Sequence, residues 1–188
     1  GAVVEAYDVR AATKEQVQSL GAKFLETKVA AEAEGGYARE LNEQEKAQQQ
    51  EMLAQHIAKA DVVITTAAIP GRPSPKIIPT SMVDGMKAGA VIIDLAAEGG
   101  GNCELSKPGE TVRHRNAVIH APLNVPSQVP YHASEMYARN LLSFLQPMIT
   151  DGEWKPDWDD EVAAMSVLTH EGAIKHEPTR KLVEGEQK

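Results

Sequence analysis

The stretch DVVITTAA, residues 61–68, is the clearest indication of the fold in this chain. It is a continuous run of β-branched and small residues, without the strict alternation of apolar and polar residues that marks a half-buried strand. Continuous runs are typical of strands buried on both faces of a parallel sheet. Three further runs predict strands of the same sheet: residues 2–8 (AVVEAYD), 90–97 (AVIIDLAA) and 117–121 (AVIHA).

Segments of helical composition lie between these runs. They are residues 13–20 (TKEQVQSL), 42–59 (NEQEKAQQQEMLAQHIAK) and 80–87 (TSMVDGMK). Alternating strands and helices predict right-handed crossovers and a parallel sheet with helices on both faces. We therefore expect an α/β, Rossmann-like domain over residues 1–147, with residues 23–25 as a further short edge strand.

The C-terminal part of the chain has a different pattern. Residues 133–145 (ASEMYARNLLSFL) predict a helix that stops at Pro147. Residues 161–169 and 173–176 flank a His-Glu-Gly turn and predict a β-hairpin, while residues 177–188 are polar and predict a frayed tail. We expect residues 148–188 to form a hairpin appendage.

Composition excludes several classes of function. The chain has 188 residues and a formal net charge of −8, and it has no Lys/Arg-rich surface segment of the kind that binds nucleic acid. No apolar run reaches the length of a membrane span, and a single cysteine fits a reducing, cytoplasmic compartment. The six histidines have no zinc-like spacing, and no serine has a nucleophile-elbow sequence.

The residues that follow the predicted strands are the candidates for a ligand site, because ligands of open parallel sheets bind at the carboxyl ends of the strands. Asp8 ends the first run, where an acidic residue accepts hydrogen bonds from ribose hydroxyls and repels a 2′-phosphate, so it favours NAD over NADP. Arg10 argues the other way, since arginine can receive a phosphate. An equally acceptable interpretation is that Asp8 caps the following helix or faces water.

The glycine-rich fingerprint of a dinucleotide site is absent from the sequence. It should lie about 20 residues before the acidic residue, and only seven residues precede Asp8. Residue patterns alone therefore predict an α/β domain and leave nucleotide binding open.

A combination of longer motifs resembles a known family of nucleotide-binding proteins. GAVVEAYDVRAATKEQVQSLGAKF, EGGYARE, ADVVITTAAIPGRPSP, MKAGAVIIDLAAEGGGNCE and NVPS together resemble the NAD(H)-binding domain I of proton-translocating nicotinamide nucleotide transhydrogenase, over residues 1 to about 176. Members of this family carry a smaller domain, the first strand and the glycine-rich loop before the segment that matches Gly1. The resemblance thus implies that this chain is a fragment lacking these parts.

The resemblance also implies a function and partners. NADH bound to domain I passes a hydride to NADP on a partner domain, and a separate membrane domain couples this step to proton movement. We expect a homodimer that is peripheral to the inner membrane through the NADP(H)-binding and membrane subunits, and that is inactive as an isolated fragment.

Site residues follow from the same resemblance. Gly36, Tyr37 and Ala38 match a mobile loop that closes over the nucleotide, although without the family context they would be an ordinary surface loop. The complete set expected to bind NAD(H) is Asp8, Val9, Gly36, Tyr37, Ala38, Thr66, Ala67, Ala68, Glu98, Asn102 and Asn124. For the last of these an Asx-type turn before proline is a nearly equal alternative.

Two other functions stay open. Alanine dehydrogenases share this fold, but they generally lack the Tyr37 loop, and they have a catalytic aspartate where this chain has Glu98. A fragment that folds and dimerises without binding nucleotide is the third hypothesis.

Overall fold

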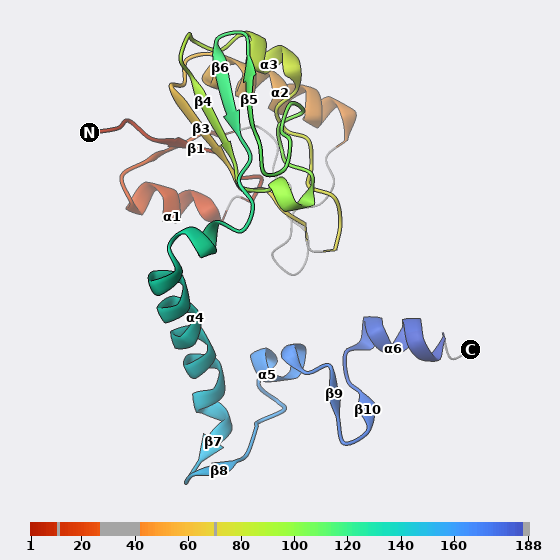
Figure 1. Cartoon of the computed structure of the whole chain (residues 1–188). Helices are drawn as coiled ribbons and strands as arrows, with labels where there is room; N and C mark the ends of the chain where they lie inside the picture. Colours follow the sequence, from red (N-terminus) through yellow and green to blue (C-terminus); the bar gives the residue numbers. More distant parts are fainter. Residues whose placement is uncertain (11, 27–41, 70, 186–188) are drawn as a thin grey trace. The chain divides into compact units, whose positions relative to one another are not determined.

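The computed structural model describes residues 1–10, 12–26, 42–69 and 71–185 (Figure 1). The chain divides into two compact units, Gly1–Leu123 and Asn124–Lys188. The sequence-based division at residue 147 stays a prediction.

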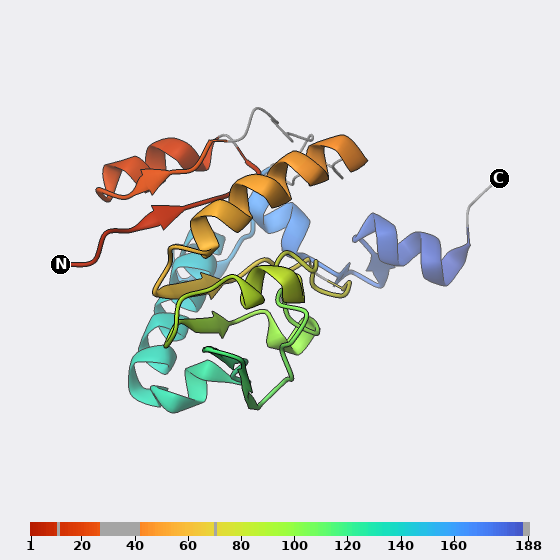
Figure 2. The same ribbon diagram turned by 90° about the horizontal axis from the view of Figure 1, so that it is seen from above.

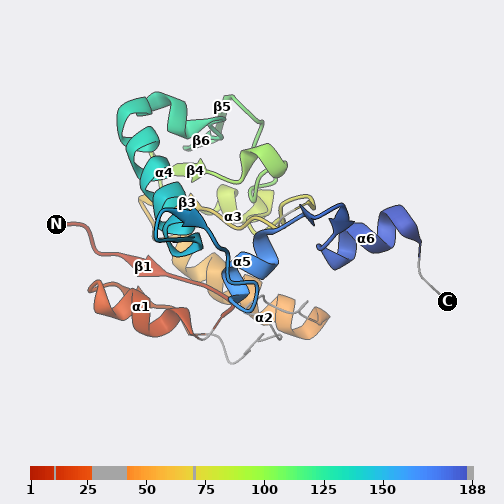
Figure 3. The same cartoon turned by 90° about the horizontal axis from the view of Figure 1, so that it is seen from below.

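The first unit begins with a small parallel β-α-β segment. Strand β1 (Glu5–Ala6) is followed by helix α1 (Thr13–Ser19) and strand β2 (Lys23–Phe24). The two strands pair in parallel, and the Leu25 N–H continues the pairing by donating to the Ala6 carbonyl at 2.8 Å. Figures 1 and 3 show α1 beside β1. A short strand was expected at residues 23–25, and β2 covers two of them. The expectation that residues 2–8 belong to the main sheet was wrong, because β1 and β2 form a separate two-stranded sheet.

The main sheet has the strand order β3-β4-β6-β5. Strands β3 (Val62–Thr65), β4 (Val91–Asp94) and β6 (Ala117–His120) are parallel neighbours, as the three continuous apolar runs predicted. Strand β5 (Thr111–His114) pairs antiparallel to β6 and was not predicted. Its sequence is polar, and the tight turn that joins it to β6 has Arg115 at a φ of +48°, which few residues adopt.

Two helices cover one face of this sheet. Helix α2 (Glu43–Ile57) starts with a capping box between Asn42 and Glu45, and the short helix α3 (Thr80–Asp84) follows β3. Their apolar side chains form the core with buried side chains of the sheet and of the loops next to it: Leu53, Ile57, Ile78, Met82, Val83, Ile92, Cys103 and Ile119. On the opposite face, Val62 and Ile64 of β3 are 57% and 64% exposed. Burial of apolar surface by α2 and α3 thus fixes one side of the sheet.

The second unit contains a long helix followed by short elements. After the 3-10 turn η2 (Val125–Gln128) come α4 (Pro130–Leu145), the 3-10 turn η3 (Gln146–Met148), β7 (Ile149–Thr150), β8 (Glu153–Trp154), α5 (Glu161–Ser166), β9 (Thr169–His170), β10 (Ala173–Ile174) and α6 (Glu177–Glu184). The expected helix near residues 133–145 and the hairpin around Glu171-Gly172 are confirmed.

Two predictions in this unit were wrong. Residues 161–166 are helical instead of extended, because the Asp160 side chain accepts a hydrogen bond from the Ala163 N–H at 2.9 Å and caps a helix. Residues 177–184 form α6 instead of a frayed tail, and an ion pair of 2.9 Å between Lys181 and Glu177 spans one of its turns.

Candidate functional site

The carboxyl ends of β1, β3 and β4 lie at one side of the first unit. Figure 2 shows the three strands running in the same direction, and β3 and β4 are parallel neighbours. Asp8 and Val9 follow β1, residues 66–69 follow β3, and residues 95–102 follow β4. This is the side at which parallel sheets bind ligands.

Asp8 is held by the arginine two residues further on. Its Oδ1 accepts hydrogen bonds from the Arg10 backbone N–H at 2.8 Å and from Nε at 3.0 Å, and its Oδ2 accepts from Nη2 at 2.8 Å. The side-chain hydrogen bonds from Arg10 lower the pKa of the Asp8 carboxyl below its ordinary value. The side chain of Asp8 is 29% exposed, so an ionised acceptor paired with a cation is accessible after β1.

The segment after β3 is hydrogen-bonded to the side chain of Asn102. The Ala67 N–H donates to Asn102 Oδ1 at 2.9 Å, and Asn102 Nδ2 donates to the Ala67 carbonyl at 2.8 Å and to the Pro75 carbonyl at 2.9 Å. Asn102 is fully buried, whereas Thr66 and Ala68 on either side of Ala67 are exposed. The structure therefore brings two predicted site residues, Ala67 and Asn102, into direct contact.

A buried carboxylate organises the loop after β4. Asp94 has no exposed surface, and its Oδ2 accepts from the backbone N–H groups of Asn102 at 2.7 Å and Cys103 at 2.9 Å. The Ser106 hydroxyl donates to the same oxygen at 2.5 Å, while Oδ1 accepts from the Thr65 hydroxyl and the Ala96 N–H, both at 3.2 Å. Residue patterns did not identify this role, although an aspartate inside the run AVIIDLAA was a usable signal.

The glycines of this loop accommodate that carboxylate and a neighbouring serine. A Cβ on Gly101 would meet Asp94 Oδ2 at 2.6 Å, and a Cβ on Gly99 would collide with the Ser74 hydroxyl. Gly100, at a φ of +96°, has open space at its Cβ position. The requirement for glycine at positions 99 and 101 is thus explained by packing within the protein.

Two further predicted residues belong to other elements of the chain. Glu98 is exposed on the 3-10 turn η1 (Ala97–Gly99). Asn124 has a left-handed φ of +48° and belongs to the second unit. Gly36, Tyr37 and Ala38 lie outside the described residues.

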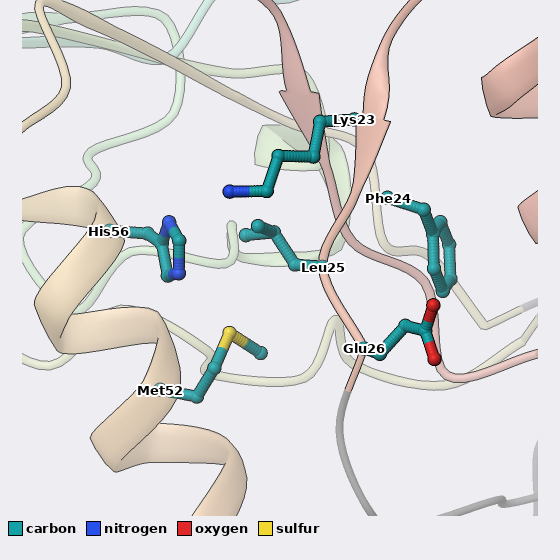
Figure 4. A pocket seen from close by; sticks show the side chains of 6 residues that line it. All are labelled: Lys23, Phe24, Leu25, Glu26, Met52 and His56. Atoms are coloured by element: carbon teal, nitrogen blue, oxygen red, sulfur yellow. The ribbon is translucent and has the colours of Figure 1, made fainter.

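A cavity of about 280 Å³ lies between β2 and α2 and is lined by Lys23, Phe24, Leu25, Glu26, Met52 and His56 (Figure 4). It contains none of the predicted site residues. At its edge, Glu5 accepts from Lys23 Nζ at 2.9 Å and lies 2.6 Å from His56 Nδ1, so the carboxylate links β1 to β2 and α2. The hydrogen bond from Lys23, followed by that with His56, lowers the pKa of Glu5.

Metal clusters and membrane helices are both absent from the described ranges. Over residues 1–185 apart from 11, 27–41 and 70, no three His, Cys, Asp or Glu side chains are placed to hold a metal ion. In the same part of the chain, no helix has the length and apolar character needed to cross a membrane.

Comparisons with known proteins agree with this fold. Over 183 residues the chain is 48% identical to an NAD(P) transhydrogenase alpha-subunit protein of Rhodospirillum rubrum, and the match covers 94% of this chain and 47% of that protein. The transhydrogenase structure from Sinorhizobium meliloti superposes with a TM-score of 0.69 at 42% identity, over 93% of this chain and 46% of that chain. This chain therefore spans about half the length of these relatives.

Alanine dehydrogenases are more distant relatives. Alanine dehydrogenase 1 of Staphylococcus aureus is 32% identical over 131 residues, covering 68% of this chain and 35% of that protein. An L-alanine dehydrogenase structure shares the fold, with a TM-score of 0.66 at 21% identity, over 98% of this chain and 47% of that chain. The model of the family described as alanine dehydrogenase/PNT, C-terminal domain, matches residues 1–177. The chain belongs to this family.

Proposed function

We propose that the chain is the NAD(H)-binding component of a proton-translocating transhydrogenase, and that NADH bound to it passes a hydride to NADP on a partner domain. The observation that carries this proposal is Asp8, which follows β1 and whose carboxylate is bonded by Arg10, on the side of the first unit where β3 also ends in an exposed segment. Similarity to transhydrogenase alpha subunits supports the same function.

The chemistry of the residues at the strand ends fits a dinucleotide. A carboxylate has about four acceptor sites, so Asp8 can receive ribose hydroxyls in addition to, or in place of, Arg10. Small residues at 67 and 68 let a nucleotide approach the backbone. We assign binding to Asp8, Val9 and residues 66–68 at these strand ends, together with Glu98, Asn124 and the loop of Gly36, Tyr37 and Ala38.

The nicotinamide supplies the hydride chemistry when the cofactor is bound, so the chain needs no nucleophile of its own. Its residues bind and orient the donor, and much of the rate enhancement comes from holding two reactants in position. Since the acceptor NADP belongs to a partner, the chain alone is expected to have no transhydrogenase turnover.

We further propose a homodimer that joins the NADP(H)-binding and membrane subunits at the cytoplasmic side of the inner membrane. Support for self-association comes from apolar side chains at the surface, including Leu142 of α4 at 63% exposed and Ile64 of β3 at 64%. Within the chain, residues 1–147 are assigned to nucleotide binding and 148–188 to the appendage. A monomer mass by sedimentation at micromolar concentration would contradict the dimer.

The test is titration with NADH and NADPH, followed by the fluorescence of the reduced nicotinamide. We expect saturable binding of NADH and weaker binding of NADPH. Asp8→Asn removes the charge that repels a 2′-phosphate, so the preference for NADH should fall several-fold. Arg10→Gln leaves the charge of Asp8 uncompensated, so the preference should rise.

Asp61→Asn is the matched control, because Asp61 lies at the opposite end of β3, where it pairs with Lys87 at 2.8 Å. The control should leave both affinities unchanged. Absence of NADH binding to the folded chain, or an equal response in all three variants, would refute the proposed site. Alanine-dependent reduction of NAD would favour the alanine dehydrogenase function instead.

A further inference from the structure

The side chain of Asn102 replaces a neighbouring strand at the end of β3. Up to Thr65, β3 is paired with β4, and the Leu95 N–H donates to the Thr65 carbonyl at 2.9 Å. Two residues later, the amide of Asn102 bonds both the N–H and the carbonyl of Ala67, at 2.9 and 2.8 Å. Backbone order therefore continues past the last residue of the strand.

Asn102 is itself fixed on every side. Its amide nitrogen also donates to the Pro75 carbonyl, and its backbone N–H donates to Asp94 at 2.7 Å. Its carbonyl accepts from the backbone N–H groups of Ile77 at 2.8 Å and Ile78 at 3.0 Å. These bonds anchor the residue to β4 and to the segment that precedes α3.

We propose that Asn102 is a positioning residue, which orients the backbone of residues 66–68 toward the nucleotide and does not touch the nucleotide itself. This inference rests on the proposed function of the strand ends. It assigns to Asn102 a different role from the direct contact that the sequence resemblance implies.

Burial and bonding of the side chain argue against a direct contact. Asn102 has no exposed surface, and its amide group already makes one accepted and two donated hydrogen bonds. To reach a ligand it would have to leave the Ala67 and Pro75 groups unpaired, which is costly in a buried place. Within residues 66–68, the exposed residues are Thr66 and Ala68, which flank Ala67 on either side.

The experiment compares Asn102→Ala with a matched control, Ser74→Ala. Ser74 is also buried and donates to the Ala96 carbonyl at 3.1 Å, so its removal breaks a hydrogen bond of the same loop without touching Ala67. Two quantities are measured on the folded chain: amide hydrogen exchange at Ala67 and the dissociation constant for NADH.

We expect exchange at Ala67 to become at least tenfold faster in Asn102→Ala, with exchange at Ile92 in β4 unchanged. The NADH dissociation constant should rise about tenfold under conditions in which the variant is fully folded. Ser74→Ala should change neither quantity. If Asn102 had only a structural role, the apparent affinity of the variant for NADH would fall only in proportion to the fraction of the protein that is unfolded.

The outcomes separate this inference from the proposed function. Weaker NADH binding with unchanged exchange at Ala67 would mean direct contact and would overturn the positioning role. Unchanged exchange together with unchanged binding would also overturn it. If the wild-type chain does not bind NADH, the proposed function fails, and the exchange measurement still decides whether Asn102 orders the end of β3. Asn102→Asp, which keeps an oxygen for the Ala67 N–H, replaces Asn102→Ala if the latter does not fold, and should show an intermediate exchange rate.

Discussion

Replacement of Gly101 by alanine should destabilise the first unit more than replacement of any glycine that has open space around it. Gly101 has a φ of +82°, and a Cβ there would lie 2.6 Å from Asp94 Oδ2 and 2.9 Å from Ser106 Cβ. The matched control is Gly89→Ala, because Gly89 has a φ of +83° and nothing within 4 Å of its Cβ position.

The expected magnitudes follow from these two environments. A left-handed backbone costs an alanine about 1–2 kcal/mol, and this cost is common to both variants. At Gly101 the carboxylate of Asp94 must also move, which weakens one or two hydrogen bonds worth about 1.5–3 kcal/mol each. We therefore expect a loss of about 1–2 kcal/mol for Gly89→Ala and about 3–5 kcal/mol for Gly101→Ala.

Urea unfolding of the two variants and the wild type measures these losses directly. The m value should stay constant while the midpoint falls further for Gly101→Ala. Equal losses in the two variants would refute the conclusion that close approach to Asp94, and not backbone conformation alone, requires glycine at position 101.

Two further predictions concern stability. Two hydrogen bonds lower the pKa of Glu104 in the folded chain, the larger effect coming from the Thr80 N–H and the smaller from the Thr80 hydroxyl. The stability that Glu104 contributes is therefore complete above its unfolded pKa. It is lost as the pH falls through its folded pKa. Glu104→Gln should lose less stability between pH 6 and pH 3 than the wild type, and parallel urea curves of the two proteins over that range would contradict this. Ile92→Ala removes a side chain with no exposed surface and should lower the free energy of unfolding by about 2–5 kcal/mol. Ile64→Ala, at a residue 64% exposed, should change it by no more than about 0.5 kcal/mol. Similar shifts of the melting temperature in both variants would contradict the assignment of the core to one face of the sheet.

The parallel strands could be predicted because continuous β-branched runs are typical of parallel sheets, although β3 has one exposed face. Continuous β-branched runs at residues 61–68, 90–97 and 117–121 correspond to β3, β4 and β6. Strand β5 escaped prediction, since its polar sequence TVRH is held by pairing with β6 and has no apolar pattern of its own. Residues 161–166 were misassigned because their short apolar run, VAAM, fits a strand or a helix, and the cap at Asp160 decides between them.

The sequence predicted which strand ends form the candidate site, but not which of its residues are buried and bonded to others. Parallel topology alone places Asp8 and residues 66–68 at the carboxyl ends of their strands. That Asn102 is buried and bonded to Ala67 depends on the path of the loop after β4, which Asp94 organises through tertiary hydrogen bonds. No local pattern carries that information.

Amide hydrogen exchange of the chain with and without saturating NADH would locate nucleotide binding most directly. Binding at the proposed site predicts slower exchange at residues 8–10 and 66–69, with no change in the β7–β8 hairpin of the second unit. Protection confined to the segments that line the cavity between β2 and α2, or no protection anywhere, would contradict NAD(H) binding at the strand ends.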